Sequence, residues 1–177
     1  MRKVRPLLLA VGPVAAAVLA ITVVACSSGR HVTAGPLGPA GNQDSECIPG
    51  KAGVPDTFGG ELLRNGSNAT ISIDRIELNG TRHMTLTRAF LAPGNVGIVA
   101  AIGFPPPVSQ VNESNWRERA TAPGYHVPPH HVVNVIVGLE RSAAVGSTNG
   151  VEVAYHQGRN HYLLKTNWKV TIKAKCF

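Results

Sequence analysis

The chain has 177 residues, of which 44% are hydrophobic and 15% are charged, and its formal net charge at pH 7 is +7. This length suits one folded domain with a hydrophobic core of its own. The basic residues are scattered, with no run of four or more. A nucleic-acid partner is therefore not expected, because proteins that bind nucleic acids gather their positive charge in patches or stripes.

The N-terminus begins with a short basic segment, which is followed by an almost entirely apolar stretch over residues 6–25. This pattern predicts a secretory signal peptide over residues 1–25. The stretch ends in Val-Val-Ala-Cys at 23–26, which resembles the lipobox of bacterial lipoproteins. The resemblance implies cleavage before Cys26 and acylation of its thiol, so that acyl chains anchor the protein to the extracellular face of the cell membrane. An uncleaved transmembrane helix and a plain secreted protein are the alternatives.

Cleavage at this position would leave 177 − 25 = 152 residues with a charge of 14 − 10 = +4, because three basic residues leave with the signal peptide. Residues 26–46 are rich in glycine and proline and have no apolar periodicity. They are expected to form a disordered tether that begins at the lipidated Cys26. The folded domain is expected to cover residues 47–177.

Two further cysteines, Cys47 and Cys176, lie near the two ends of this expected domain. In an oxidising compartment they are expected to form a disulfide. Free thiols and a metal site are the alternatives, although no histidine is close to either cysteine in the sequence.

Alternation of apolar and polar residues with a period of two predicts seven or eight short strands and almost no helix. The expected strands lie at 57–64, 69–78, 83–91, 96–104, 132–141, 150–156, 161–164 and 168–176. Many short strands separated by turns favour an all-β fold, an antiparallel immunoglobulin-like β-sandwich closed by the disulfide.

Three details of the pattern make sharper predictions. Ile71 and Ile73 share one face of their strand, but the next apolar residues are out of phase, which predicts a β-bulge at residues 74–75. Asn-Gly at 79–80 is typical of a hairpin turn. Alternation in the last strand predicts that Cys176 lies on its core face.

The lipobox, the Gly-Ser-Asn-Ala-Thr-Ile sequence at 66–71, the Val-Ala-Tyr-His sequence at 153–156 and the terminal cysteine together resemble small, uncharacterised lipoproteins of high-GC Gram-positive bacteria. The resemblance covers most of the chain beyond the signal peptide. It implies a lipid-anchored, immunoglobulin-like sandwich outside the cytoplasm, and it implies no particular activity.

No catalytic motif stands out: Gly-x-Ser-x-Gly and Ser-x-x-Lys are absent and the ten acidic residues are dispersed. We therefore expect a protein without enzymatic activity or a cofactor. Its function would be to bind an envelope protein, an anionic wall polymer or a small ligand. The long connection over 105–131 is the candidate contact region. The residues there that suit an interface are Trp116, Arg117, Arg119 and Tyr125, although Trp116 could instead fill the end of the sandwich.

The alternative function is metal binding, because imidazole is a good ligand for zinc and copper. Three histidines, His126, His130 and His131, lie in the long connection, and His156 and His161 flank one hairpin turn. Their spacing matches no established metal site. The alternative hypothesis therefore assigns a Zn²⁺ or Cu²⁺ site to the loop histidines 126, 130 and 131, with His156 as a further ligand.

Overall fold

The computed structural model describes residues 35–41, 44–94, 99–110 and 116–177. The predicted signal peptide, the lipidation site at Cys26 and most of the predicted tether lie outside the described residues. Within those ranges, no helix is both long and apolar enough to cross a membrane.

The largest sheet has six strands in the order β1-β3-β9-β5-β7, with β6 pairing to one end of β3. All pairs in this sheet are antiparallel. Its strands are β1 (Leu37–Pro39), β3 (Asp56–Asn65), β5 (Met84–Pro93), β6 (Val99–Ala101), β7 (Ala120–Thr121) and β9 (Val132–Arg141).

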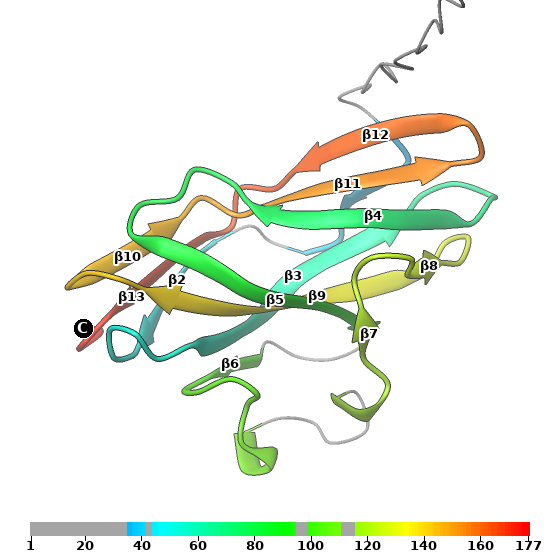
Figure 1. Cartoon of the computed structure of the whole chain (residues 1–177). Helices are drawn as coiled ribbons and strands as arrows, with labels where there is room; N and C mark the ends of the chain where they lie inside the picture. Colours follow the sequence, from blue (N-terminus) through cyan, green and yellow to red (C-terminus); the bar gives the residue numbers. More distant parts are fainter. Residues whose placement is uncertain (1–34, 42–43, 95–98, 111–115) are drawn as a thin grey trace, which may run out of the picture.

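The remaining strands form two smaller sheets, β12-β11-β4-β8 and β10-β13-β2. Figure 1 shows the four-stranded sheet above the six-stranded sheet, with the three-stranded sheet at one end of the molecule. Their strands are β2 (Ser45–Pro49), β4 (Ile71–Leu78), β8 (His126–Val127), β10 (Val145–Thr148), β11 (Val151–Gln157), β12 (Asn160–Lys165) and β13 (Lys169–Lys173), and a short 3-10 helix, η1 (Val108–Gln110), lies outside the sheets.

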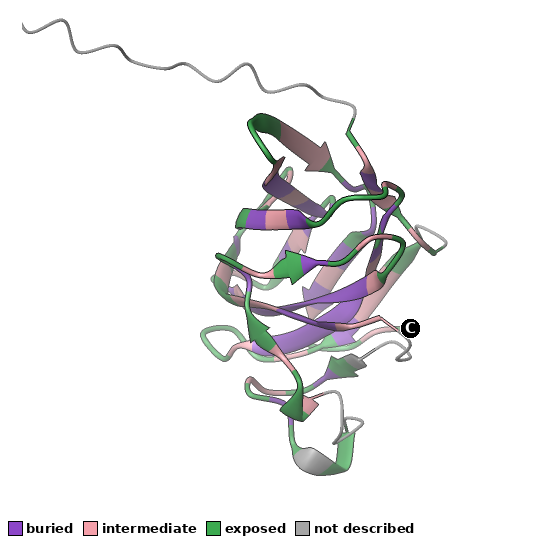
Figure 2. Cartoon of the chain, turned by 90° about the vertical axis from the view of Figure 1, so that its right-hand side faces the viewer, coloured by how far each residue is buried: buried purple, intermediate pink, exposed green. Residues whose placement is uncertain are grey.

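One hydrophobic core joins all three sheets, so the prediction of a β-sandwich is confirmed. Alternate residues of β4, β9, β11 and β13 point into this core and are almost fully buried, as shown by the purple segments of the strands in Figure 2. Burial of one such side chain contributes about 1.5–3 kcal/mol. The core cluster includes Leu63, Ile71, Ile73, Val135, Leu139, Val153, Tyr155, Val170 and Ile172.

The predicted β-bulge in β4 is present. Ile73 pairs with Tyr155 and Arg75 pairs with Ala154, so Asp74 is the extra residue in the ladder. Asp74 and Arg75 are exposed, and Ile76 returns to the core with 7% of its surface exposed. The bulge therefore lets the strand keep its apolar residues inside although their spacing changes.

The disulfide between Cys47 and Cys176 is also confirmed. It links the segments at β2 and β13, which pair in parallel, so the sandwich is not wholly antiparallel. The predicted last strand is too long, because β13 ends at Lys173. Ala174 is exposed and Cys176 is half-buried, so the alternation does not continue to the disulfide.

The predicted tether is wrong in its C-terminal part. Leu37–Pro39 form β1 and pair with β3, and β2 begins at Ser45. The buried amide of Leu37 donates a hydrogen bond of 3.2 Å to the hydroxyl of Tyr155. These contacts supply the hydrogen-bond partners and the burial that this segment lacks on its own.

Two strand predictions need correction. The Asn-Gly turn at 79–80 is not a hairpin, because β4 and β5 belong to different sheets. Of the strand expected over 96–104, residues 99–101 form β6 and residues 102–104 lie beyond its end, whereas residues 96–98 are outside the described residues. Strand β9 has the expected bounds, but its residues are buried on both faces, and part of the outer face is covered by Phe104 from the segment after β6. At Gly138 an added Cβ would lie 2.9 Å from the ring of Phe104.

Candidate metal site on the outer face of the four-stranded sheet

Two histidines lie opposite each other on neighbouring strands of the four-stranded sheet. His156 of β11 pairs with His161 of β12, and their ring centroids are 5.5 Å apart. Because side chains alternate along a strand and the flanking Tyr155 is in the core, His156 points away from the core. Cross-strand pairing therefore places two imidazoles side by side on the outer face.

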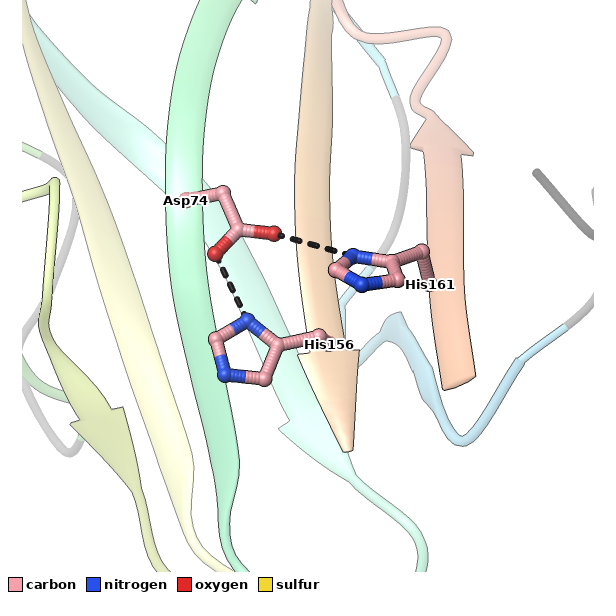
Figure 3. A group of neighbouring side chains, drawn as sticks. All are labelled: Asp74, His156 and His161. Carbon is pink, nitrogen blue, oxygen red and sulfur yellow. Dashed lines mark hydrogen bonds and ion pairs between the residues drawn. The ribbon is translucent and has the colours of Figure 1, made fainter. Parts of the chain in front are cut away.

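The bulge residue of β4 completes the group. Asp74 Oδ1 is 2.7 Å from Nδ1 of His156, and Asp74 Oδ2 is 3.8 Å from Nδ1 of His161. Figure 3 shows the two carboxylate oxygens each directed at a different ring. One ligand atom from each of the three residues lies within 4.8 Å of the others. The three side chains are partly exposed, by 38% for Asp74, 34% for His156 and 47% for His161.

Two imidazoles and one carboxylate form a donor set that suits Zn²⁺ and other transition metals. With bonds of about 2.0–2.1 Å to a tetrahedral ion, the donor atoms would lie roughly 3.3 Å apart. The observed separations of up to 4.8 Å therefore need a contraction of the site. Exposed side chains can make such a movement by rotation without disturbing the core. Three protein ligands would leave at least one coordination position open to water or another molecule.

The loop histidines of the metal hypothesis do not form a site with one another. His126 Nδ1 is 2.9 Å from Oγ of Ser72, and His130 Nε2 is 2.8 Å from Oδ1 of Asn68. His131 Nδ1 is 2.8 Å from the carbonyl oxygen of Pro129, two residues earlier. Each ring thus has a different partner. Their closeness in sequence does not bring their ligand atoms together, because the chain turns at 128–131.

His126 nevertheless belongs to the same sheet as the Asp74–His156–His161 cluster. Ser72 pairs with His156 on one side and with His126 of β8 on the other. The register therefore produces a cross-strand row of His161, His156, Ser72 and His126. Strands are about 4.8 Å apart, so His126 lies two strand spacings, about 10 Å, from His156.

The four residues proposed from sequence as an interface fall into two groups. Trp116 packs against Phe90 and Phe104, with ring centroids 6.0 and 6.4 Å away. The guanidinium of Arg119 lies 3.9 Å from the centroid of the Trp116 ring and donates a hydrogen bond to the Trp116 carbonyl. These contacts support the alternative that Trp116 is a packing residue, although the side chain remains half-exposed.

The other two residues are separate from this pair. Arg117 is exposed, and Tyr125 is half-buried and packs against the core cluster. Burial raises the pKa of the Tyr125 hydroxyl, and the negative charge of Glu118 raises it further. The backbone of Tyr125 is fixed to β4, because its carbonyl accepts a 2.9 Å hydrogen bond from the amide of Ile73.

The metal hypothesis left out two residues of this site: His161, which was noted only as flanking a turn, and Asp74. The position of Asp74 in the predicted bulge and the two histidines around one turn were the available signals. Neither signal says that β4 and β11 are neighbours, and residues 74 and 156 are far apart in the sequence.

Comparisons with known proteins add little to this geometry. No family model matches the chain, and no curated protein matches it. A solved structure with some similarity is the ASH/PapD-like domain of human CEP192 (PapD-like domain 7), with 10% sequence identity and a TM-score of 0.39. The match covers 79% of this chain and 85% of that chain. At this score, the likeness supports no inference about the function of the chain.

Proposed function

We propose that this chain is a lipid-anchored protein of the extracellular face of the cell membrane, without enzymatic activity, whose β-sandwich binds a small ligand. The lipobox-like sequence at 23–26 and a disulfide that closes the domain support an extracytoplasmic location, because disulfides persist in oxidising compartments. Of the ligands considered, a transition-metal ion is the one that the geometry supports best.

The observation that carries the metal proposal is the convergence of Asp74, His156 and His161 from three neighbouring strands. The ion is Zn²⁺ or Cu²⁺, since imidazole suits both. Binding requires neutral imidazoles, so metal affinity falls as the pH is lowered. The partly exposed position of the site favours exchange of the ion with the surroundings over permanent structural binding.

The test of the metal proposal is a calorimetric titration of the full chain with Zn²⁺ and, separately, with Cu²⁺. We expect one ion per chain, and we expect His161→Ala and Asp74→Asn each to weaken binding by about tenfold or more, a loss of about 1.4 kcal/mol. His131→Ala is the matched control, because it removes an exposed histidine outside the cluster and should leave the affinity unchanged. Binding that is insensitive to the cluster variants would refute the assignment.

The test of the anchor is the intact mass of the protein purified from membranes. Loss of residues 1–25 together with added acyl chains supports the proposal. A full-length, unmodified mass would identify the N-terminal stretch as an uncleaved membrane segment. Pull-down from the same membranes and binding to purified wall polymer would test the remaining partner classes, an envelope protein or an anionic polymer.

A further inference from the structure

A second feature lies outside the metal cluster, at the end of the β3–β9 pair where β3 begins at Asp56 and β9 ends at Arg141. A pocket of about 650 Å³ opens there beside the connection between β2 and β3. Its walls are mostly apolar and are formed by Pro49, Ala52, Val54, Ile102 and Ala174. Pockets of this volume, with apolar walls and few polar groups, are typical of sites for small organic molecules.

Exposed apolar side chains are concentrated near this pocket. Among the described residues, the large hydrophobic side chains that are exposed are Val54 (42%), Ile102 (55%), Val145 (47%) and Phe177 (105%). Val54 and Ile102 line the pocket itself. Val145 lies close by, because it pairs with Lys173, which in turn pairs with Pro49. Covering an exposed apolar rim of this kind with a ligand lowers the free energy, because apolar surface is removed from water.

The polar groups of the pocket carry an excess of positive charge. Arg141 is only 5% exposed, and its Nη2 donates a 2.7 Å hydrogen bond to the carbonyl of Gly50. Its Nη1 donates to the carbonyls of residues 143 and 144. The Nε–H of Arg141 has no partner among the described residues. Lys51, which is exposed, adds a second cation to the lining.

One acidic residue, Asp56, also lines the pocket, so its two cations face a single carboxyl group. Asp56 is fully buried; its Oδ1 accepts a 3.0 Å hydrogen bond from the amide of Gly103, and its Oδ2 has no partner among the described residues. Burial raises the pKa of Asp56, and this effect exceeds the opposing effects of the Gly103 amide and the Arg141 charge. Buried polar atoms without partners are costly, so the Nε–H of Arg141 would gain from a ligand that supplies an acceptor.

We propose that this pocket binds a small amphipathic carboxylate, such as a medium-chain fatty acid. Its apolar chain packs along Val54 and Ile102, and its carboxylate turns toward Arg141 and Lys51. The carboxylate accepts hydrogen bonds, which matches the unpartnered Nε–H of Arg141, and its charge complements the two cations. A cationic amphiphile of the same length is disfavoured, because it would place a third positive charge beside them.

The test compares sodium octanoate with octylamine, a pair with the same chain and opposite head-group charge. Each is titrated calorimetrically into the full chain in lipid nanodiscs, with empty nanodiscs as the blank. We expect saturable binding of octanoate and binding of octylamine that is weaker by about tenfold or more. Octanoate that does not bind at millimolar concentration, or octylamine that binds equally well, would overturn the proposal.

Two surface variants assign the binding to the pocket. Ile102→Asp places a charge on the apolar wall, and Lys51→Glu reverses one cation; both positions are exposed, so the fold should persist. Each is expected to weaken octanoate binding by about tenfold or more. Lys169→Glu is the matched control for Lys51→Glu, since it reverses an exposed cation outside the lining. Ile102→Val, which keeps the wall apolar, is the matched control for Ile102→Asp. Equal losses in the variants and their controls would refute the assignment. The result is independent of Zn²⁺ binding, which the same variants should not alter.

Discussion

Removing the disulfide between Cys47 and Cys176 should cost this domain a large part of its stability. The crosslink joins residues separated by 129 positions. In the chain-entropy relation, closing such a loop lowers the entropy of the unfolded chain by roughly 17 cal/mol/K, which corresponds to about 5 kcal/mol at 25 °C. The folded state should change little, because β2 and β13 remain paired over five positions without the crosslink. Since domains of this size are stable by about 5–15 kcal/mol, the loss would be a third or more of the total.

The assay is urea unfolding of the Cys47→Ala/Cys176→Ala double variant beside the wild type, both without reductant. We expect a lower midpoint and a larger dependence of the unfolding free energy on urea, because the uncrosslinked unfolded chain exposes more surface. A loss of less than about 1 kcal/mol would refute the reasoning. It would mean that the unfolded chain keeps these two segments together without the disulfide.

Three further predictions concern buried polar groups. Asn65 is fully buried and donates hydrogen bonds to the carbonyls of residues 69, 127 and 128. Asn65→Ala should therefore lower the free energy of unfolding, measured with urea, by about 2–3 kcal/mol. A loss below about 0.5 kcal/mol would contradict this role. Tyr155→Phe leaves the buried amide of Leu37 without its acceptor and should cost about 1–2 kcal/mol, with faster hydrogen exchange at that amide as the local check. Burial raises the pKa of Asp56 above its ordinary value of 3.8, so the folded state binds this proton more tightly than the unfolded state does. The free energy of unfolding should then fall as the pH rises from 3.8 through the higher folded pKa. Asp56→Asn should therefore gain stability relative to the wild type between pH 4 and pH 7, and an equal difference at both pH values would contradict the assignment.

The sequence was sufficient to predict the features that depend on local periodicity. Strand β9 has the predicted bounds because its apolar residues alternate without interruption. The bulge in β4 followed from a change of phase between Ile73 and Ile76, which no regular strand can accommodate when both side chains are buried. The disulfide followed from the number and positions of the cysteines and from the expected compartment.

The features that were missed depend on which segments become neighbours. Strand β1 has only three residues, and nothing in its own sequence indicates that it pairs with β3. On the second face of β9, Gly138 is covered by Phe104, which stacks with Phe90 at 6.0 Å. The sequence pattern of a strand shows that its residues are apolar, but it does not show which segment covers its outer face.

The candidate metal site combines both kinds of information. In a ladder without the bulge, Asp74 would pair with Ala154 and Arg75 would turn toward the core, whereas the observed register lets Ile76 fill that place. The extra residue thus allows β4 to bury its isoleucines while Asp74 and Arg75 both remain exposed. Because bulges redirect side chains at defined positions, the same local irregularity that preserves the core presents the Asp74 carboxylate to His156 and His161. Core packing explains why the bulge is present. It does not require that the exposed bulge residue be an aspartate, or that two histidines lie opposite it. That combination is what a metal site would require.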